Sequence, residues 1–176
     1  MVLLKSVRGF NPEFGSKCYF AENATIIGDV VMGDECSVWF NSIIRGDVNS
    51  VRIGNRVNIQ DGAVIHCNYK DSVTIIGDNV SIGHNAIVHG ATLENNVLVG
   101  MGAIIMDHAL IGESSVIAAG AIITKHTIVE PGSVYGGTPA KLIKKYDPDH
   151  LKRMTLMIAK KYLMYKGWFE EESNQE

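Results

Sequence analysis

The chain has 176 residues, which is long enough for a single domain with a sizeable hydrophobic core. A formal net charge of −3 gives no basis for nucleic-acid binding, and no apolar run approaches the roughly 20 residues that cross a bilayer. Three cysteines without zinc-ligand or Cys-x-x-Cys spacing, and the short apolar stretch within residues 1–10, predict a cytoplasmic protein rather than a secreted one.

An apolar residue recurs at every sixth position along most of the chain. The series, with three changes of phase, is Phe20, Ile26, Met32, Val38, Ile44; Ile53, Ile59, Ile65; Ile76, Ile82, Val88; and Leu93, Val99, Ile105, Ile111, Ile117, Ile123, Val129. This period does not suit an amphipathic helix, whose apolar stripe recurs every 3.6 residues. It predicts short parallel strands joined by tight turns, three to a coil, which stack into a triangular prism of about six coils over residues 1–145.

Residues after Val134 leave this repeat and predict a single helix. Asp147 suits the N-cap and Pro148 the first helical position. The apolar residues that follow at steps of three and four are Leu151, Met154, Ile158, Tyr162 and Tyr165. We therefore expect an amphipathic helix over residues 146–169, ending near Gly167 and packed on the prism or on a neighbouring subunit, with a frayed tail at 170–176.

Three histidines fall at defined positions on the predicted prism, where Ile53, Ile59 and Ile65 open the first, second and third faces. His66 and His89 each follow the inward residue of a third-face strand on adjacent coils, so they point outward about 4.8 Å apart. Arg45 likewise follows the inward residue of the third-face strand one coil earlier.

His84 lies on the second face instead. Asp61 holds the same position one coil earlier, with Gln60 beside it. Within one chain His84 is expected to be too far from the third face to join His66 and His89. A three-fold trimer that brings the second face of one chain against the third face of the next would complete a site of three histidines at each interface.

Three neutral imidazoles leave a fourth position open on Zn²⁺, which is the catalytic arrangement, and water bound there has a pKa near 7. Imidazole also suits Fe²⁺ and Co²⁺. Asp61 and Gln60 are placed to orient that water or to fix a ligand tautomer. Arg45 is placed to pair with a carboxylate across the interface or to attract an anionic product. The other histidines, His108, His126 and His150, are expected to be ordinary surface residues.

Several segments together resemble the γ-class carbonic anhydrase family over about residues 10–145. They are the strings at 28–34, 37–40, 44–47 and 58–61, the histidine strings ending at His66 and His89, and the segments 100–103 and 138–141. Many acyltransferases share the hexapeptides, whereas the Arg-Gly-Asp, Gln-Asp and three-histidine set is specific. The pattern is closest to small homologues named for phenylacetic-acid degradation or ferripyochelin binding.

This resemblance implies a left-handed parallel β-helix that forms a homotrimer. It implies metal ligation by His66, His84 and His89 from two chains, and it matches Arg45 and Asp47 to an interface salt-bridge pair. Gln60 and Asp61 match residues near the metal-bound solvent. The implied reaction is attack of zinc hydroxide on carbon dioxide to give bicarbonate, followed by proton release.

The chain departs from the family prototype at the proton-shuttle positions. Val48 stands where the prototype has a glutamate, and the loop 67–71 is short and lacks one. Turnover is therefore expected to depend on buffer, or on Asp71 or Tyr69 as a substitute, and activity is expected to be low.

Two other functions use similar residues. One is acyl transfer from, or hydrolysis of, an acyl-CoA with a histidine as general base. It predicts a long protruding loop and a coenzyme-A pocket near the C-terminal coils, and the longest break in the repeat is only five residues. The other is a non-catalytic trimer that binds a metal or siderophore.

Overall fold

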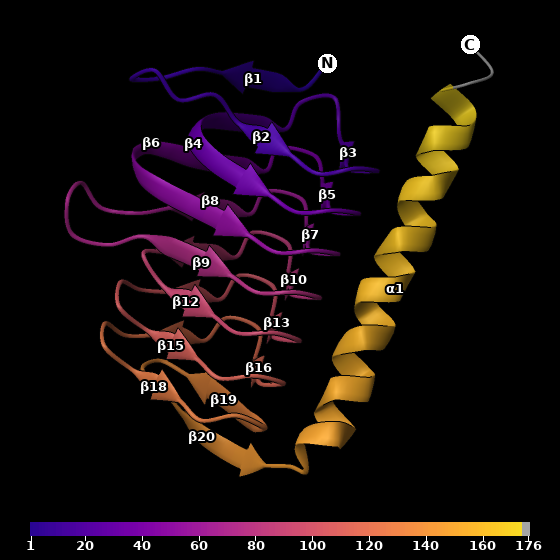
Figure 1. The fold of residues 1–176 in the computed structure, drawn as a ribbon. Coiled ribbons are helices and arrows are strands. Elements are labelled where there is room, and N and C mark those ends of the chain that lie inside the picture. Colours follow the sequence, from indigo (N-terminus) through magenta and orange to yellow (C-terminus); the bar gives the residue numbers. More distant parts are fainter. Residues whose placement is uncertain (174–176) are drawn as a thin grey trace.

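The computed structural model describes residues 1–173 and has the predicted fold, a left-handed parallel β-helix with one C-terminal helix (Figure 1). The prism has about seven turns rather than six. The additional turn comes from β1 (Leu3–Lys5) and β2 (Glu13–Phe14), which lie outside the six-residue pattern and pair in parallel with β4 (Thr25–Met32). These N-terminal strands lack the six-residue repeat, but they belong to the prism because they pair with β4.

The second face is a stack of short parallel strands closed by one antiparallel strand. From the N-terminal end these are β3 (Tyr19–Phe20), β5 (Ser37–Val38), β7 (Asn58–Ile59), β10 (Ser81–Ile82), β13 (Leu98–Val99), β16 (Val116–Ile117), β19 (Ser133–Gly137) and the antiparallel β20 (Ala140–Lys145). Each parallel strand pairs with the one a full coil away, as the phase of the repeat predicts.

The other two faces belong to one sheet, because β4 and β6 (Ile43–Ile53) bend and serve both. On the third face β6 is followed by β8 (Val64–His66), β11 (Ile87–His89), β14 (Ile104–Ile105) and β17 (Ile122–Ile123). On the first face it is followed by β9 (Thr74–Ile76), β12 (Thr92–Leu93), β15 (Leu110–Ile111) and β18 (Ile128–Val129).

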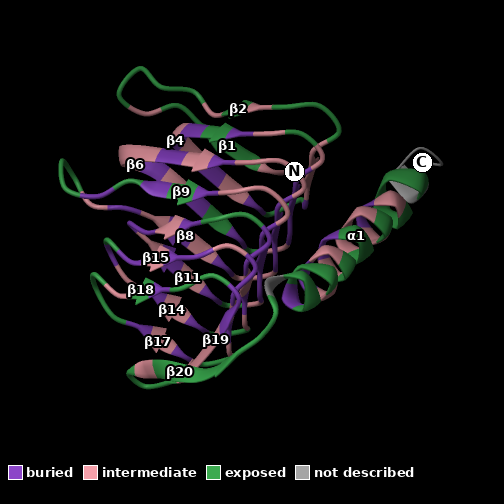
Figure 2. Ribbon diagram, turned by 60° about the horizontal axis from the view of Figure 1, so that its bottom comes forward, coloured by how far each residue is buried: buried purple, intermediate pink, exposed green. Residues whose placement is uncertain are grey.

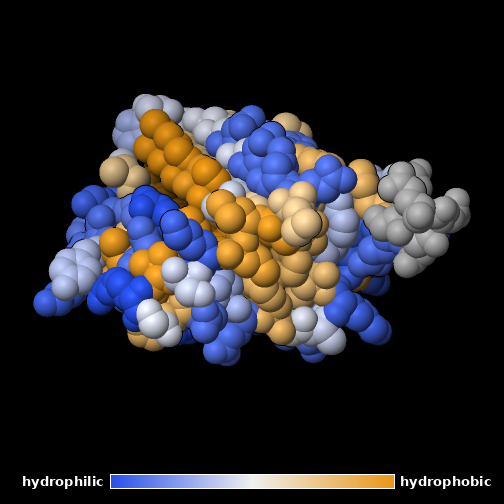
Figure 3. Space-filling model, turned by 90° about the horizontal axis from the view of Figure 1, so that it is seen from above, coloured by the Kyte–Doolittle hydropathy of each residue, from blue (hydrophilic) through white to orange (hydrophobic). Residues whose placement is uncertain are grey.

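The predicted column of apolar residues forms the core. Fully buried large side chains include Ile26, Met32, Ile44, Ile59, Ile65, Ile76, Ile82, Leu93, Ile105, Ile111, Ile117 and Ile123. Along β4 and much of β6, buried residues alternate with less buried ones, as Figure 2 shows. The N-terminal end is less well covered, since Met1, Leu3, Leu4 and Phe10 are exposed, and Figure 3 shows apolar surface in the view from above. Burial of one apolar residue per strand therefore keeps the coils in phase, which fixes the direction of every outward side chain.

The helix α1 (Pro148–Ser173) runs back beside the prism toward its N-terminal end (Figure 1). Asp147 caps it as expected, accepting a hydrogen bond from the Asp149 amide at 2.8 Å. The expected end near Gly167 is wrong, because the helix continues to Ser173; the rest of the expected frayed tail, 174–176, lies outside the described residues. No helix in the described part of the chain is long and apolar enough to cross a membrane.

Aromatic packing explains the extra length of α1. The ring of Phe169 lies 5.7 Å from that of Tyr19 and 5.5 Å from that of Trp39, and Tyr162 makes an edge contact with Trp39 at 5.5 Å. A glycine costs a helix only about 1 kcal/mol, which the ring contacts of Phe169 beyond it outweigh. These tertiary contacts explain why the helix continues beyond Gly167.

Candidate metal centre

His66 and His89 are direct neighbours on the third face. They end β8 and β11 and are paired in register across the two parallel strands. His66 Nδ1 lies 3.2 Å from His89 Nε2, and the ring centroids are 5.1 Å apart. Strand spacing of about 4.8 Å makes this approach a direct result of the repeat. The two side chains are only 16% and 28% exposed, so they form a partly sheltered pair of nitrogen donors.

Carboxylates hold the second nitrogen of each ring. Asp47 Oδ1 lies 3.0 Å from His66 Nε2, and Asp107 Oδ1 lies 2.9 Å from His89 Nδ1. The other oxygen of Asp47 forms an ion pair with Arg45 at 2.7 Å. A carboxylate behind the imidazole fixes the orientation and tautomer of the ring, and metal-binding histidines commonly have such a partner. The geometry and donor chemistry of this pair therefore fit a divalent metal.

Burial and the charge of Arg45 favour the neutral form of His66, which is the form that binds metal. Burial lowers the pKa of His66, and the positive charge of Arg45 adds to this, together outweighing the hydrogen bond to Asp47. Burial alone would raise the pKa of Asp47, but the hydrogen bond with His66 and the charge of Arg45 hold it below its usual value. The pair is therefore an ionised carboxylate beside a neutral imidazole at neutral pH.

Asp107 was not among the residues selected from the sequence. Its Oδ1 also accepts hydrogen bonds from Ser72 Oγ and Asn68 Nδ2, both at 2.8 Å. Burial opposes its ionisation, but the hydrogen bonds from Ser72 and His89 keep the pKa of Asp107 below its usual value. Counting coils could have drawn attention to it, because Asp107 falls one coil beyond Gly90, the residue that follows His89.

Gly90 makes room for this carboxylate. It has a φ of +58°, and a Cβ built on it would collide with Ser72 Oγ and Asp107 Oδ1. Any larger residue at this position would therefore push Asp107 away from His89. The contact between Asp107 and His89 therefore depends on a glycine at position 90.

His84 lies on the second face, in the turn that follows β10. Its Nδ1 contacts Asp61 Oδ2 at 2.9 Å, and the side chains of His84 and Asp61 are 39% and 42% exposed. Gln60 is almost buried, and its Nε2 donates to Asn58 Oδ1 at 3.0 Å. A cavity of about 310 Å³ between this face and α1 is lined by Gln60, His84 and Tyr162, among other residues. The predicted neighbours of His84 are therefore beside it.

The three histidines do not meet within one chain. Among residues 1–173, no three His, Cys, Asp or Glu side chains are grouped so that they could hold a metal ion. His66 and His89 are thus a two-donor pair, and His84 is a separate, exposed donor on a different face. If all three bind one ion, a second copy of the chain has to supply one part of the set.

Comparison with known proteins identifies the family. A model described as "Bacterial transferase hexapeptide (six repeats)" matches residues 90–125, and "Hexapeptide repeat of succinyl-transferase" matches residues 73–106. A protein named carbonic anhydrase from Geobacillus kaustophilus is 50% identical over 147 residues, covering 84% of this chain and 80% of the relative. "Gamma carbonic anhydrase 2, mitochondrial" from Arabidopsis thaliana is 36% identical, covering 91% of this chain and 59% of the relative. The chain belongs to the γ-class carbonic anhydrase family.

A solved structure shares the fold of this γ-class chain. The crystal structure of a hexapeptide transferase family protein from Anaplasma phagocytophilum superposes with a TM-score of 0.87 at 36% identity, covering 95% of this chain and 98% of that one. Its name refers to transferases, as do the names of the two repeat models. A shared fold does not by itself indicate a shared reaction.

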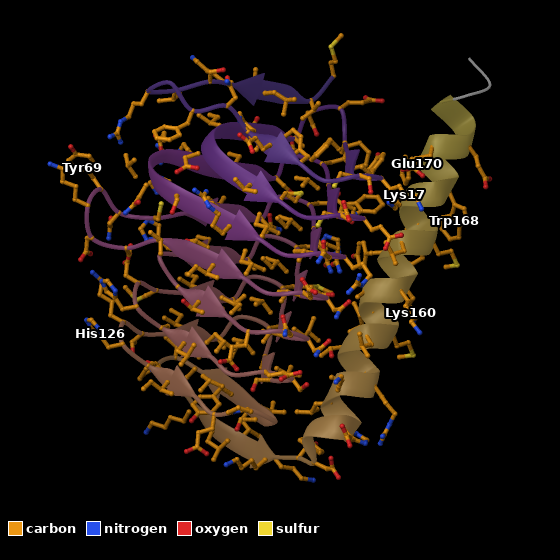
Figure 4. All side chains as sticks on the ribbon, viewed as in Figure 1. Lys17, Tyr69, His126, Lys160, Trp168 and Glu170 are labelled. Carbon is orange, nitrogen blue, oxygen red and sulfur yellow. The ribbon has the colours of Figure 1, made fainter. Side chains whose placement is uncertain are left out.

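The loop 67–71 of this γ-class chain carries exposed polar groups at the edge of the third face. Tyr69 is 56% exposed and lies under the guanidinium of Arg8, 5.5 Å from the ring centroid. Asp71 contacts His108 Nε2 at 3.3 Å, and His108 stacks on His126 with ring centroids 4.9 Å apart. Figure 4 shows Tyr69 and His126 on the side of the prism away from α1. His108 and His126, expected to be ordinary surface residues, thus form a stacked pair beside this loop.

Proposed function

We propose that this chain is a carbonic anhydrase that interconverts carbon dioxide and bicarbonate in the cytoplasm. In this proposal Zn²⁺ is held between subunits of a homotrimer by His66 and His89 of one chain and His84 of the next. Fe²⁺ or Co²⁺ could take the same place. The observation that carries the proposal is the register pair of His66 and His89, each backed by a carboxylate. Relatives named carbonic anhydrase, one of them 50% identical, support it.

Each residue of the site has a defined task. Asp47 and Asp107 orient the two third-face imidazoles, and Asp61 does so for His84. A divalent metal held by three neutral imidazoles supplies a Lewis acid that lowers the pKa of water to near 7. Gln60, fixed by Asn58, positions carbon dioxide or water beside His84. Arg45, the positive group nearest to Asp47, attracts the bicarbonate anion.

Proton release depends on exposed groups or on buffer. Val48 offers no carboxyl group, and within loop 67–71 the ionisable candidates are Asp71, which is paired with His108, and Tyr69. A group that passes a proton to solvent has to be exposed, which holds for both. We therefore propose that turnover is low in dilute buffer and rises with imidazole concentration.

Metal analysis followed by stopped-flow kinetics tests this function. The protein would be purified, its metal content measured, and carbon dioxide hydration followed after restoring Zn²⁺, Fe²⁺ or Co²⁺ in concentrated imidazole buffer. His84→Ala and His89→Ala should abolish activity, whereas the matched control His150→Ala should not. A metal-replete trimer without hydration activity would overturn the proposal and leave a non-catalytic metal-binding trimer.

Acyl transfer is the second candidate, supported by the names of the matched repeat models and of the similar structure. In that case His84 would act as a general base rather than a ligand. Acetyl-CoA would then bind to the metal-free protein, and His84→Ala would weaken that binding. For a carbonic anhydrase, chelation abolishes activity and acetyl-CoA does not bind.

A further inference from the structure

Two of the three cysteines lie next to each other at one corner of the prism. Cys18 directly precedes β3 and Cys36 directly precedes β5, and these parallel strands pair with Tyr19 opposite Ser37. The Tyr19 amide donates to the Cys36 carbonyl at 2.9 Å. Cys18 Sγ donates to the Gly33 carbonyl at 3.2 Å, and Cys36 Sγ donates to the Gly54 carbonyl at 3.1 Å. Neighbouring strands lie about 4.8 Å apart, which is within the Cα separations that disulfides span.

We propose that Cys18 and Cys36 are a thiol-modification site that forms a reversible disulfide within the chain when it meets a low-molecular-weight disulfide. Cys18, which is partly exposed, is the thiol that attacks. Cys36, which is 1% exposed, is the thiol that resolves the intermediate. This site is far along the chain from the candidate metal ligands and does not depend on the proposed function.

The surroundings of Cys18 favour a reactive thiolate. The neighbouring Cys36 is the largest influence, and together with the ammonium group of Lys166 it lowers the pKa of Cys18 to about 7, although burial opposes it. Lys166 is 7% exposed on α1, and its Nζ donates to the Lys17 carbonyl, so the charge is held in place. Figure 4 shows Lys17 between the top of the prism and α1. A larger fraction of Cys18 than of an ordinary cysteine is therefore thiolate at neutral pH.

The oxidation consists of two exchanges that balance. The Cys18 thiolate attacks one sulfur of glutathione disulfide, the S–S bond breaks, and one glutathione thiolate leaves. Cys36 then loses its proton to solvent, its sulfur attacks that of Cys18, and the second glutathione thiolate leaves. Overall two protein thiols are oxidised and one glutathione disulfide is reduced to two glutathione molecules.

The second exchange becomes easier once the first has occurred. The pKa of Cys36 is raised chiefly by the neighbouring thiol of Cys18, and burial adds to this. When Cys18 is in a mixed disulfide it no longer carries the charge that holds this proton. The remaining obstacle is burial, so the closing step is expected to be slower than the first.

Cys67 provides an internal comparison. It is 0% exposed, and burial raises its pKa. Its neighbour one coil further on is Gly90, which offers no thiol. Oxidation under native conditions is therefore expected to leave Cys67 unchanged.

Peptide mapping of the full-length protein tests the site. The folded chain would be treated with glutathione disulfide, then unfolded in denaturant containing iodoacetamide, and digested with trypsin and a protease that cleaves after glutamate. Cleavage after Lys17, Glu22, Glu35 and Arg45 places the two cysteines in the separate peptides 18–22 and 36–45. We expect these peptides to be joined, the link to be lost on reduction, and the Cys67 peptide to be alkylated. Peptide 18–22 recovered only as alkylated thiol or as a glutathione adduct would overturn the proposal.

Two variants separate reactivity from packing. Cys36→Val matches Val57, which occupies the same corner one coil further on, so the chain should still fold. In this variant Cys18 should accumulate as the glutathione adduct, and the midpoint of its alkylation rate against pH should rise from about 7 toward that of an ordinary thiol. An unchanged midpoint would refute the pairing. Cys67→Ala, the control, should still form the cross-linked peptide.

Discussion

Asp107 Oδ1 lies 2.9 Å from His89 Nδ1, with the bare backbone of Gly90 leaving the space between them. The carboxylate comes from the coil beyond His89 and is 7% exposed. Its bonds to Ser72 and Asn68 anchor it from the side of the loop 67–71. The orientation of one candidate metal ligand is therefore set by a residue that is 18 positions away in the sequence.

Replacing Asp107 with asparagine should weaken metal binding without displacing His89 from its strand. The amide keeps the size of the side chain but loses its charge, and loss of a partner of this kind typically costs about 10- to 100-fold in metal affinity. Competition with a zinc chelator would measure the change. Asp71→Asn removes an exposed carboxylate that contacts His108 instead, so its metal affinity should stay within error of the wild type.

Gly90→Ala should destabilise the chain more than Gly102→Ala. Both glycines have positive φ, +58° and +65°, so both substitutions strain the backbone by about 1 kcal/mol. Only at Gly90 does the new methyl group collide with Ser72 and Asp107. This collision should bring the total loss of unfolding free energy at Gly90 to about 2–3 kcal/mol. Urea unfolding of the metal-free variants measures the loss of unfolding free energy in each. Equal losses would mean that Asp107 and Ser72 can move aside without cost.

Mixed trimers should test whether the ligands come from two chains. His84→Ala and His89→Ala subunits are each expected to be inactive alone. After co-expression in equal amounts, about a quarter of the interfaces should unite an intact His84 with an intact His66–His89 pair. Carbon dioxide hydration and metal content should return in that proportion. A ligand set supplied by a single chain would give no recovery.

Alkaline pH should weaken the contact between α1 and the second face through Tyr162. Burial, with the negative charge of Asp61, raises the pKa of Tyr162 to about 12, above its ordinary value of 10.0. The unfolded chain therefore releases the phenol proton first, so this contribution to stability is complete below about pH 10 and is lost between pH 10 and 12. Unfolding free energies measured up to pH 11 should fall more steeply for the wild type than for Tyr162→Phe. Parallel curves would contradict this assignment.

The recurrence of an apolar residue at every sixth position was sufficient to predict the prism and the direction of each outward histidine. Burial requires one large apolar side chain per strand, so the positions of Ile65 and Val88 determine that His66 and His89 are neighbours. The same counting placed Asp61 beside His84. These relations follow from strand spacing and phase alone, which is why no knowledge of side-chain packing was needed.

Features that depend on packing between distant segments could not be predicted in this way. The role of Asp107 requires the loop 67–71 to fold so that Asn68 and Ser72 meet it, and the phase of the repeat says nothing about that loop. The continuation of α1 beyond Gly167 rests on the contact of Phe169 with Tyr19 and Trp39. Helix propensity, which is a local property, pointed to an earlier end.

The loop between β8 and β9 leaves the prism and returns to it with the next coil in register. Residues can therefore be added or removed there without rotating His89 relative to His66. The part of the molecule that would pass protons to solvent can therefore change independently of the part that would bind the ion, provided that Asn68 and Ser72 still reach Asp107. Replacing residues 69–71 with a longer acidic segment, while keeping Asn68 and Ser72, is accordingly a contained engineering step.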